Sequence, residues 1–387
     1  MKRKIAYVSG NRSEFGLIKK TLRTLNLDDR TEIQLYLIGA HLIPELGDTK
    51  SEIIEEGLPI KDVIYTFENI EKFDLGKIMA VSLEKIGEAF KKNKPDILLV
   101  VGDRYESFCA AIAGYIMKIP IVHVHGGELT QGALDDGFRH AITKLASIHF
   151  VSTEDYRTRV IQLGENPMNV HNVGGLGVDD IEGMTFSSRM ELEEKYGFEF
   201  KKNNFLITYH AETANDSSPG SHFSEILKSL SLFPDCIQIF TAPAPEPGGE
   251  EILNLIEKYV NNNNNATFIK SMGKSDYFSM LRYSTAVIGN SSSGLLEAPS
   301  FQVLTLNIGQ RQSGRIKANS VIDVECDAQE ITAKLLGIIN GEFSNKLSGL
   351  VNPYSKKNTS EIIARFLIEQ NLDSFRKLPF YDLEKIN

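Results

Sequence analysis

Short apolar runs rich in β-branched residues alternate with helical patterns along the whole chain, and this alternation constrains the fold more than any other feature. It is typical of repeated βα units, in which the strands form a parallel sheet and the helices cover it. The predicted strands of the first half are KIAYVSG, EIQLYLIG, DILLVVGD, IVHVHGG, IHFVST and VHNVGG. Those of the second half are FLITYH, CIQIFTA, ATFIK, TAVIGN and VLTLNIG. The sequence therefore predicts an α/β protein with two similar halves.

The length of 387 residues also favours two domains, because single hydrophobic cores stop growing at roughly 250 to 300 residues. We place the boundary in the Gly- and Asp-rich stretch VGGLGVDDIEG, which gives domains of residues 1–180 and 181–355. Residues 356–387 contain an amphipathic helix, SEIIARFLIEQ, which we expect to pack back across the cleft between the domains.

Charge and cysteine content exclude several classes of function. A net charge of -9 argues against a general nucleic-acid binder, because such proteins need a basic face. Three distant cysteines without a CxxC pair encode neither a disulfide framework nor a zinc knuckle. The apolar run at the N-terminus is too short for a signal peptide, and the longest run elsewhere, ILLVV, cannot span a bilayer. We expect a cytoplasmic protein that binds neither nucleic acid nor membranes.

Polar side chains follow several of the predicted strands. Ligands of open α/β sheets bind beyond the carboxyl ends of the strands, so these positions are candidates for a site. The predicted loops after four strands carry Arg12 and Glu14; Asp103, Arg104 and Glu106; Glu128; and His210. In the predicted topology these loops converge on one cleft.

The stretch IVHVHGGELTQGALDDGFRHAITK, residues 121–144, could serve either a metal ion or proton transfer. His123 and His125 alternate on an apolar strand and would share one face, as the paired histidines of metal-dependent barrel hydrolases do. The other histidines show no HxxH or HxxE pattern, and only His210 lies at a suitable strand end. Structural use of strand histidines is also the commoner outcome, so the pattern favours proton transfer.

Three carboxylates support that interpretation. Glu128 follows two glycines that allow a sharp turn, and Asp135 starts a predicted helix together with Asp136. An N-cap or first-turn charge is the alternative role for each aspartate. Gathered with Asp103 from another loop, Glu128 and Asp135 would crowd one another, which could raise some pKa values toward neutrality, as acid/base catalysis requires.

The stretch VIGNSSSGLLEAPS, residues 287–300, is the clearest phosphate signal. A strand ends in glycine, Ser291 and Ser292 follow, and a short helix begins, so hydroxyl and backbone N–H groups would face an anion. An ordinary serine cap is the alternative. Glu297 could hold a ribose diol or be a solvated helix carboxylate. The basic loop NIGQRQSGR, with Arg311 and Arg315, suits a diphosphate, although surface arginines are equally common.

Taken in order, the motifs GNRSEFG, GDRYES, HVHGGE, DDGFRHAITK, GNSSSGLLEAPS and NIGQRQSGR resemble those of the hydrolysing UDP-N-acetylglucosamine 2-epimerases of bacterial sialic acid synthesis, over nearly the whole chain. The resemblance implies two Rossmann-like domains facing a central cleft, the GT-B-like fold of one large class of glycosyltransferases. It also implies UDP-sugar chemistry with no cofactor, neither metal nor nicotinamide, and a homodimer or homotetramer.

The resemblance assigns roles to individual residues. The acid/base carboxylates of the family fall on Asp103, Glu128 and Asp135, and its essential histidine falls on His210. Its nucleotide and phosphate contacts fall on Arg12, Ser291, Ser292 and Glu297, with Arg104 and Arg315 as further assignments. The implied reaction converts UDP-N-acetylglucosamine to UDP and N-acetylmannosamine for sialic acid synthesis, by elimination of UDP to a 2-acetamidoglycal and addition of water.

Other functions stay open at this point. After His210 the chain reads AETANDSSPG, where relatives of the sialic acid branch commonly have Pro and a Thr-bearing turn. A close branch carries out the same reaction on UDP-2,4-diacetamido-2,4,6-trideoxyglucose for legionaminic acid synthesis. A GT-B glycosyltransferase, a non-hydrolysing 2-epimerase, a metal hydrolase and a nucleotide-sugar sensor are further alternatives.

Overall fold

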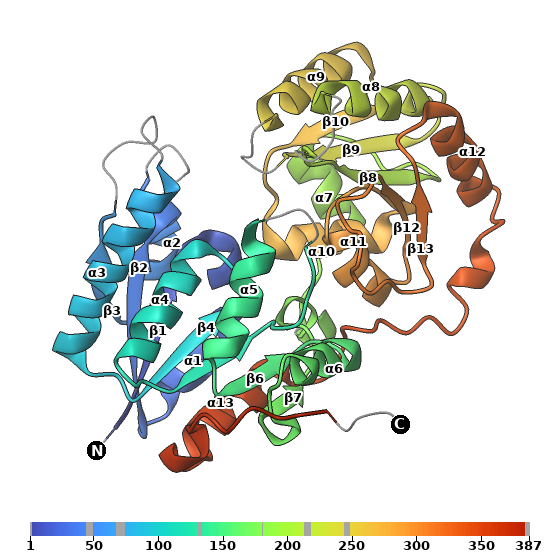
Figure 1. Ribbon diagram of the computed structural model, residues 1–387. Coiled ribbons are helices and arrows are strands. Elements are labelled where there is room, and N and C mark those ends of the chain that lie inside the picture. The colour runs from blue at the N-terminus through green and yellow to red at the C-terminus, as the bar shows by residue number, and fades with distance from the viewer. Residues whose placement is uncertain are drawn as a thin grey trace. The chain divides into compact units, whose positions relative to one another are not determined.

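A computed structural model of the protein describes residues 2–43, 49–66, 74–130, 134–179, 181–212, 218–243 and 248–383. The chain forms two compact units, each with its own parallel sheet (Figure 1). The first unit contains the described residues up to Leu129, those from 134 to Asp179, and those from Lys356 onward. The second contains the described residues from 181 to Ser355.

The first unit has a seven-stranded sheet in the order β3-β2-β1-β4-β5-β6-β7, in which all neighbours are parallel. Its strands are β1 (Arg3–Ser9), β2 (Thr31–Ile38), β3 (Ile60–Ile64), β4 (Ile97–Val101), β5 (Ile121–Val124), β6 (Ile148–Val151) and β7 (Val170–Asn172). Every residue of β4 is buried, which explains why it is apolar throughout instead of alternating.

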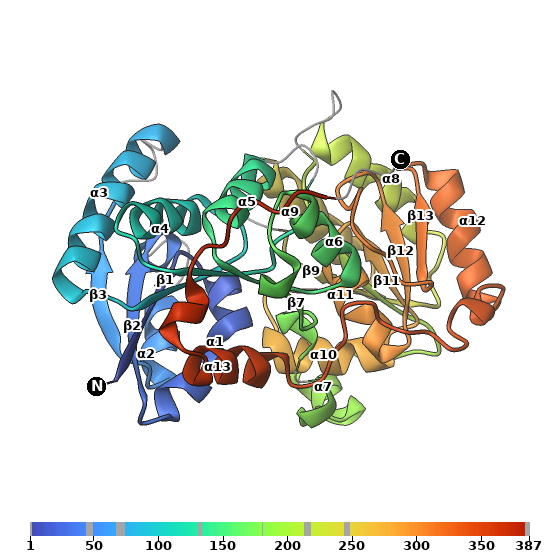
Figure 2. The same cartoon turned by 60° about the horizontal axis from the view of Figure 1, so that its bottom comes forward.

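Helices cover both faces of this sheet. They are α1 (Arg12–Leu27), α2 (Thr49–Glu55), α3 (Leu75–Asn93), α4 (Tyr105–Ile116), α5 (Leu134–Leu145), α6 (Glu154–Gln162) and α13 (Thr359–Glu369). One hydrophobic cluster joins α1 and α13 to one face of the sheet, and another joins α3, α4 and α5 to the opposite face. Figure 2 shows α13 beside α1, so the last described helix completes the core of the first unit.

The second unit repeats the plan with a six-stranded parallel sheet in the order β10-β9-β8-β11-β12-β13. Its strands are β8 (Asn204–Thr208), β9 (Ile237–Thr241), β10 (Ala266–Ile269), β11 (Ala286–Gly289), β12 (Leu304–Ile308) and β13 (Val321–Val324). Its helices are α7 (Arg189–Tyr196), α8 (Pro219–Leu230), α9 (Gly249–Asn262), α10 (Gly273–Tyr283), α11 (Ser293–Leu296) and α12 (Ala328–Ile339). The predicted α/β fold with two parallel, Rossmann-like sheets is confirmed.

Short 3-10 helices lie between or after these elements. They are η1 (Gly39–Leu42), η4 (Pro167–Asn169), η5 (Leu176–Val178), η6 (Ile181–Gly183), η7 (Ala298–Phe301), η8 (Ser344–Lys346) and η9 (Leu372–Phe375). None of the helices in the described part of the chain is both long and apolar enough to cross a membrane.

The strand orders place one topological switch point in each unit. In the first sheet, the chain builds outward on one side of β1 and then continues from β4 on its other side, so the switch lies between β1 and β4. In the second sheet the equivalent point lies between β8 and β11. Loops that leave the carboxyl ends of such neighbouring strands form the usual ligand crevice of an open α/β sheet.

Candidate active site

The first loop at the β1/β4 switch point leads directly into α1. Asn11 is the N-cap, and its Oδ1 accepts a hydrogen bond from the Glu14 backbone N–H at 2.9 Å. Arg12 and Glu14 therefore lie in the first helical turn, and their predicted place in a loop was wrong. The side chain of Arg12 is exposed, whereas Glu14 is only 7% exposed.

The loop after β4 carries a compact charge network. Arg104, the N-cap residue of α4, donates from Nε to Glu106 Oε2 at 3.1 Å and from Nη2 to Glu106 Oε1 at 3.3 Å. Glu106 is fully buried, so this bidentate pair supplies the positive charge that a buried carboxylate needs. Asp103 accepts a hydrogen bond from Arg139, a buried residue of α5. Arg104 is thus already paired with a carboxylate before any phosphate reaches it.

Asp135 joins the same network from the first turn of α5, as the sequence predicted. Burial, followed by the negative charge of Asp103, raises the pKa of its carboxyl group to about 6. A carboxyl group with such a pKa can both accept and release a proton near neutral pH. Asp136, the next residue, lies with its Oδ2 3.6 Å from His140 Nε2, an i,i+4 pair on the same helix.

Glu128 follows the strand β5 and has its own set of partners. His125 Nδ1 donates to Glu128 Oε1 at 2.7 Å, and Ser152 Oγ donates to the same oxygen at 3.1 Å. His125 Nε2 faces the Leu176 backbone N–H at 3.4 Å, which fits the tautomer with hydrogen on Nδ1. The arrangement makes Glu128 the acceptor of two side-chain hydrogen bonds.

The turn that presents Glu128 depends on its unusual backbone. His125 has a φ of 67° and Gly127 a φ of 80°. A Cβ at position 127 would lie 2.5 Å from the Tyr156 carbonyl oxygen, so only glycine fits there. This confirms the predicted sharp turn.

His123 and His125 do not share one face of a strand, contrary to the prediction. His123 lies in β5 and is fully buried, with Nε2 2.8 Å from the Gly102 carbonyl oxygen and Nδ1 3.1 Å from Thr143 Oγ1. His125 lies beyond the strand end in the left-handed conformation, so its ring turns toward Glu128. Within the described ranges, no group of three or more His, Cys, Asp or Glu side chains is arranged to hold a metal ion.

In the second unit, Asn290 links the loops that follow β8 and β11. Its Oδ1 accepts from the His210 backbone N–H at 2.7 Å, and its Nδ2 donates to the His210 carbonyl oxygen at 2.9 Å. The histidine is therefore held by its backbone in both directions. Burial lowers the pKa of the His210 imidazole to about 4, with a further contribution from the positive charge of Arg311. The imidazole is neutral at pH 7.

Glu212 organises the basic loop that follows β12. Its Oε1 accepts hydrogen bonds from the backbone N–H groups of Gln310 and Arg311, both at 3.1 Å. Gln312 Nε2 donates to the Asn290 carbonyl oxygen at 2.8 Å. Hydrogen bonds of buried side chains thus join the loops that follow β8, β11 and β12.

The turn at Ser291 and Ser292 leads into a very short helix. The helix that follows it, α11, has only four residues, so its dipole is small compared with that of a full helix. Ser292 is the N-cap residue of α11 but makes no side-chain capping hydrogen bond, so the ordinary serine cap that the sequence left open does not form. Ser291 Oγ accepts from the Ser293 backbone N–H at 3.4 Å, a local turn contact. Gly289 has a φ of 126°, and a Cβ there would lie 2.0 Å from the Thr208 carbonyl oxygen. An anion at this turn would therefore depend on serine hydroxyls more than on a helix dipole.

Glu297 is the C-cap residue of the short helix α11. Burial raises the pKa of its carboxyl group, while Ser293, Lys274 and Arg315 lower it by smaller amounts. Glu297 Oε2, the Ser293 hydroxyl and the Tyr277 hydroxyl are buried close to one another, and the Ser293 side chain interacts with both Glu297 and Tyr277. The Glu297 carboxyl group is thus surrounded by side chains that can donate hydrogen bonds or carry positive charge.

The structure therefore gathers the predicted site residues into two sets. The first unit holds Asp103, Arg104 and Asp135 together, with Arg12 at the start of α1 and Glu128 on the next strand end. The second unit holds His210, Ser291, Ser292, Glu297 and Arg315. Residues 213–217, which include most of the loop that departs from the sialic acid pattern, lie outside the described residues.

Sequence reasoning did not assign roles to Glu14, Glu106, His125, Arg139, Glu212 or Asn290. Glu14 and Glu106 were named only as members of strand-end loops, and Glu212 could have been suspected because it is a carboxylate just beyond a strand end. Asn290 had no signal beyond its place between a strand and the serines.

The sequence profile described as UDP-N-acetylglucosamine 2-epimerase matches residues 23–368. The chain belongs to the UDP-N-acetylglucosamine 2-epimerase family.

Individual relatives of this epimerase agree with the assignment. The chain is 34% identical over 386 residues to the polysialic acid biosynthesis protein P7 of Escherichia coli, covering 98% of both chains. It is 36% identical to the GDP/UDP-N,N'-diacetylbacillosamine 2-epimerase (hydrolyzing) of Campylobacter jejuni, covering 99% of this chain and 100% of the relative. Its fold matches the UDP-GlcNAc 2-epimerase of Methanocaldococcus jannaschii, solved with UDP-GlcNAc and UDP, with a TM-score of 0.75, 18% identity and coverage of 94% and 99%.

Proposed function

We propose that this epimerase is of the hydrolysing type and converts a UDP-2-acetamido sugar to UDP and the free 2-epimer. A proton leaves C2 while the C1–O bond to UDP breaks, which gives a 2-acetamidoglycal. Water then adds its oxygen to C1, and C2 receives a proton on the opposite face. The net change is one water consumed and one UDP released for each sugar inverted at C2.

The observation that carries this proposal is the presence of two acid/base groups with different partners in the first unit. Inversion at C2 needs a proton removed from one face of the sugar and a proton supplied to the other. Asp135, with Asp103 beside it and a pKa of about 6, is one such group. Glu128, hydrogen-bonded to His125 and Ser152, is the other. A glycosyltransferase that only moves the sugar would need no such pair.

The second unit carries groups suited to the leaving nucleotide. Ser291, Ser292 and Arg315 would bind the diphosphate, where cationic and hydroxyl groups stabilise the charge that develops as UDP departs. Glu297 would accept hydrogen bonds from the ribose hydroxyls. A diphosphate near His210 would raise the pKa of the imidazole, because an opposite charge favours its protonated form. His210 could then donate a hydrogen bond to the departing phosphate.

We propose UDP-N-acetylglucosamine as the substrate, with N-acetylmannosamine as the product for sialic acid synthesis. The relative from E. coli, named for polysialic acid biosynthesis, supports this choice. The relative from C. jejuni, named for N,N'-diacetylbacillosamine, supports a second candidate, the UDP-2,4-diacetamido-2,4,6-trideoxy sugar that leads to legionaminic acid.

Product analysis tests the proposal. The purified enzyme is incubated separately with UDP-N-acetylglucosamine and UDP-N,N'-diacetylbacillosamine, and the products are identified by NMR. We expect UDP and free N-acetylmannosamine from the first substrate at a higher kcat/KM than from the second. The reverse order would assign the enzyme to the second substrate. Intact UDP-N-acetylmannosamine as the final product would contradict the hydrolysing mechanism.

The serine turn gives a prediction about UDP binding alone. Replacing both serines, Ser291→Val and Ser292→Val, removes two hydroxyl donors to a charged group and adds bulk. We expect the affinity for UDP, measured by calorimetry, to fall by at least about 10-fold, because hydrogen bonds to charged groups contribute ~1.5 to 3 kcal/mol each. Ser231→Val, at the exposed C-cap of α8, is the control and should bind UDP normally. Unchanged affinity in a folded double variant would refute this placement.

A further inference from the structure

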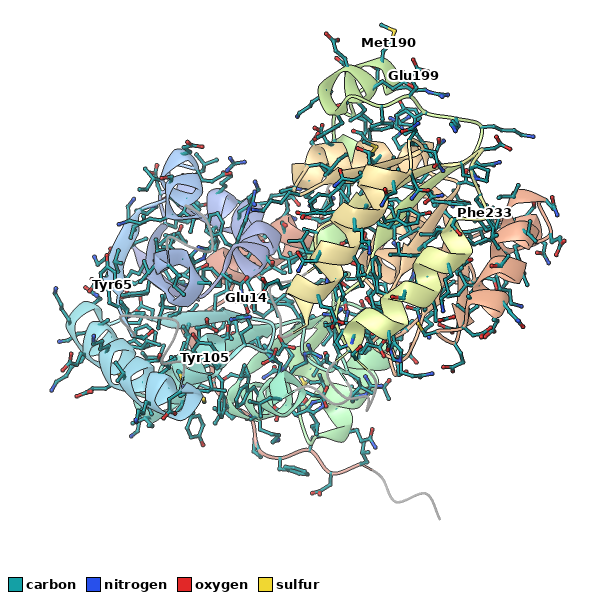
Figure 3. All side chains as sticks on the ribbon, turned by 90° about the horizontal axis from the view of Figure 1, so that it is seen from above. Glu14, Tyr65, Tyr105, Met190, Glu199 and Phe233 are labelled. Carbon is teal, nitrogen blue, oxygen red and sulfur yellow. The ribbon has the colours of Figure 1, made fainter. Side chains whose placement is uncertain are left out.

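Glu14 is a buried carboxyl group for which the proposed reaction has no role. Its Oε2 accepts a hydrogen bond from Asn11 Nδ2 at 3.2 Å. Its Oε1 is buried and has no hydrogen-bond partner in the described part of the chain. The residue lies in the first turn of α1, and Figure 3 labels both Glu14 and Tyr105 of the first unit. An unpartnered oxygen at the β1/β4 switch point needs an explanation.

The surroundings of Glu14 are rich in negative charge. Glu106, fully buried, is its strongest electrostatic neighbour, and Asp103 and Asp135 act on it in the same direction. Glu106 itself is tightly enclosed, because a Cβ at Gly10 would lie 2.7 Å from its carboxyl carbon. The Glu106 charge is therefore fixed in place beside Glu14.

The cations of this region already have partners. Arg104 forms its bidentate pair with Glu106, and Arg139 donates to Asp103. With Glu14, Asp103, Glu106 and Asp135 all ionised, the network would hold four negative charges and these two positive ones. A proton on one of the four would reduce the imbalance, and Glu14 is the member with an oxygen that has no partner.

Two groups of effects compete for the Glu14 proton. The Asn11 amide and the N-terminal end of α1 favour the carboxylate. Burial and the charge of Glu106 favour the neutral acid, and Arg104 only partly offsets them, so the pKa of Glu14 is raised well above its usual value. Because Oε2 accepts from Asn11, the proton belongs on the unpartnered Oε1.

We propose that Glu14 is a neutral acid that acts as a positioning residue for the carboxylates of the first unit: it keeps its proton during turnover and so allows Asp103 and Asp135 to carry charge beside the buried Glu106. Oε1 lies close to Gly102, the residue directly before Asp103: a Cβ added at Gly102 would be 3.4 Å from this oxygen. Loss of the proton would place a new negative charge at the base of the Asp103 loop. This role rests on the proposed function, whereas the protonation of Glu14 does not.

Activity should therefore fall as the pH rises through the range in which Glu14 loses its proton. The charged or titratable groups that act on Glu14 or respond to it belong to β1, to the loop after β4, to the first turn of α4 and to α5. They are Tyr7, Asp103, Arg104, Glu106 and Asp135. Of these, Asp135 has a pKa of about 6, and burial raises the pKa of Tyr7 well above its usual value.

Glu14→Gln tests the proposal without using the reaction. Glutamine preserves the neutral shape, and its Oε1 can accept from Asn11. We expect the infrared spectrum of the wild type at pH 7 to contain a carbonyl band of a protonated carboxylic acid that the variant lacks. The exposed first-turn glutamate of α6 provides the matched control, Glu154→Gln, which should leave that band unchanged.

Thermal stability gives a second readout. A carboxyl group with a raised folded-state pKa destabilises the fold as pH rises above its unfolded-state pKa, since the unfolded chain loses the proton first. The melting temperature of Glu14→Gln should therefore match the wild type near pH 4 and exceed it at pH 7 to 8. Glu154, whose folded-state pKa is lowered, should show the opposite sign. If Glu14→Gln does not fold, Glu14→Met supplies a second neutral side chain of similar length.

The pH profile connects the residue to turnover. We expect the alkaline limb of kcat for Glu14→Gln to move to higher pH, with a loss at neutral pH far smaller than that of Asp135→Asn. Absence of the carboxylic acid band in the wild type, or a variant less stable at pH 7 than the wild type, would overturn the proposal. An unchanged alkaline limb would overturn the positioning role. If the wild type turned over no UDP sugar, the proposed function would fail while the infrared and stability results still decided the protonation of Glu14.

Discussion

Replacing Asp135 with asparagine should lower kcat by roughly 100- to 10,000-fold, the usual range for loss of a general acid or base. The amide keeps the size of the carboxyl group but cannot exchange a proton at neutral pH. The kcat/KM of the wild type should fall below about pH 6 as Asp135 becomes protonated, and the variant should lack this limb. Affinity for UDP should stay close to that of the wild type, because we assign the diphosphate and ribose contacts of Ser291, Ser292 and Glu297 to the second unit.

The neighbouring aspartate supplies a matched control for this experiment. Asp136 occupies the same first turn of α5, and its partner is His140, one turn further along. We expect Asp136→Asn to cost about 1 kcal/mol of stability or less and to leave kcat nearly intact. Equal losses of kcat in both variants would remove the special role that we give to Asp135.

Glu128→Gln should produce a loss of kcat in the same range of roughly 100- to 10,000-fold. The amide oxygen can still accept hydrogen bonds from His125 and Ser152, so the turn should keep its shape. Proton exchange is lost, and KM should change much less than kcat. Steady-state kinetics, with melting temperature as a check on folding, make the measurement.

Ser152→Ala separates the effect of the Glu128 charge from the effect of the hydrogen bond that Ser152 donates to it. It removes one hydrogen bond to Glu128 Oε1 but leaves the carboxylate and its contact with His125. The loss of kcat should be much smaller than in Glu128→Gln. Full activity of a well-folded Glu128→Gln would show that this carboxylate does not carry the proton.

The sheets could be predicted because their central strands are apolar runs, but two edge strands were missed. β3 (IKDVI) and β13 (VIDV) each include a charged residue that interrupts the apolar pattern. Each of these two strands has a neighbouring strand on one side only, so its other edge can carry polar groups. A search for continuous apolar runs finds the interior of a parallel sheet more easily than its edges.

The candidate site was predictable in position but not in its internal contacts. A carboxylate beyond a strand end is visible in the sequence, and Asp103 and Glu128 were found in that way. Asp135 was found as a residue at the start of a predicted helix. The left-handed turn at His125 was not visible, because a strand of alternating residues predicts the same face for His123 and His125. The pairing of Arg104 with Glu106 depends on burial, which spacing alone does not show.

Turnover in deuterated water tests the central claim most directly. The claim is that C2 is deprotonated and later receives a proton from an enzyme acid that exchanges with solvent. NMR and mass spectrometry of the released sugar should show one deuterium at C2, together with free UDP. A released 2-epimer that retained its original C2 hydrogen would contradict C2 deprotonation with solvent exchange, whichever residue carried the proton.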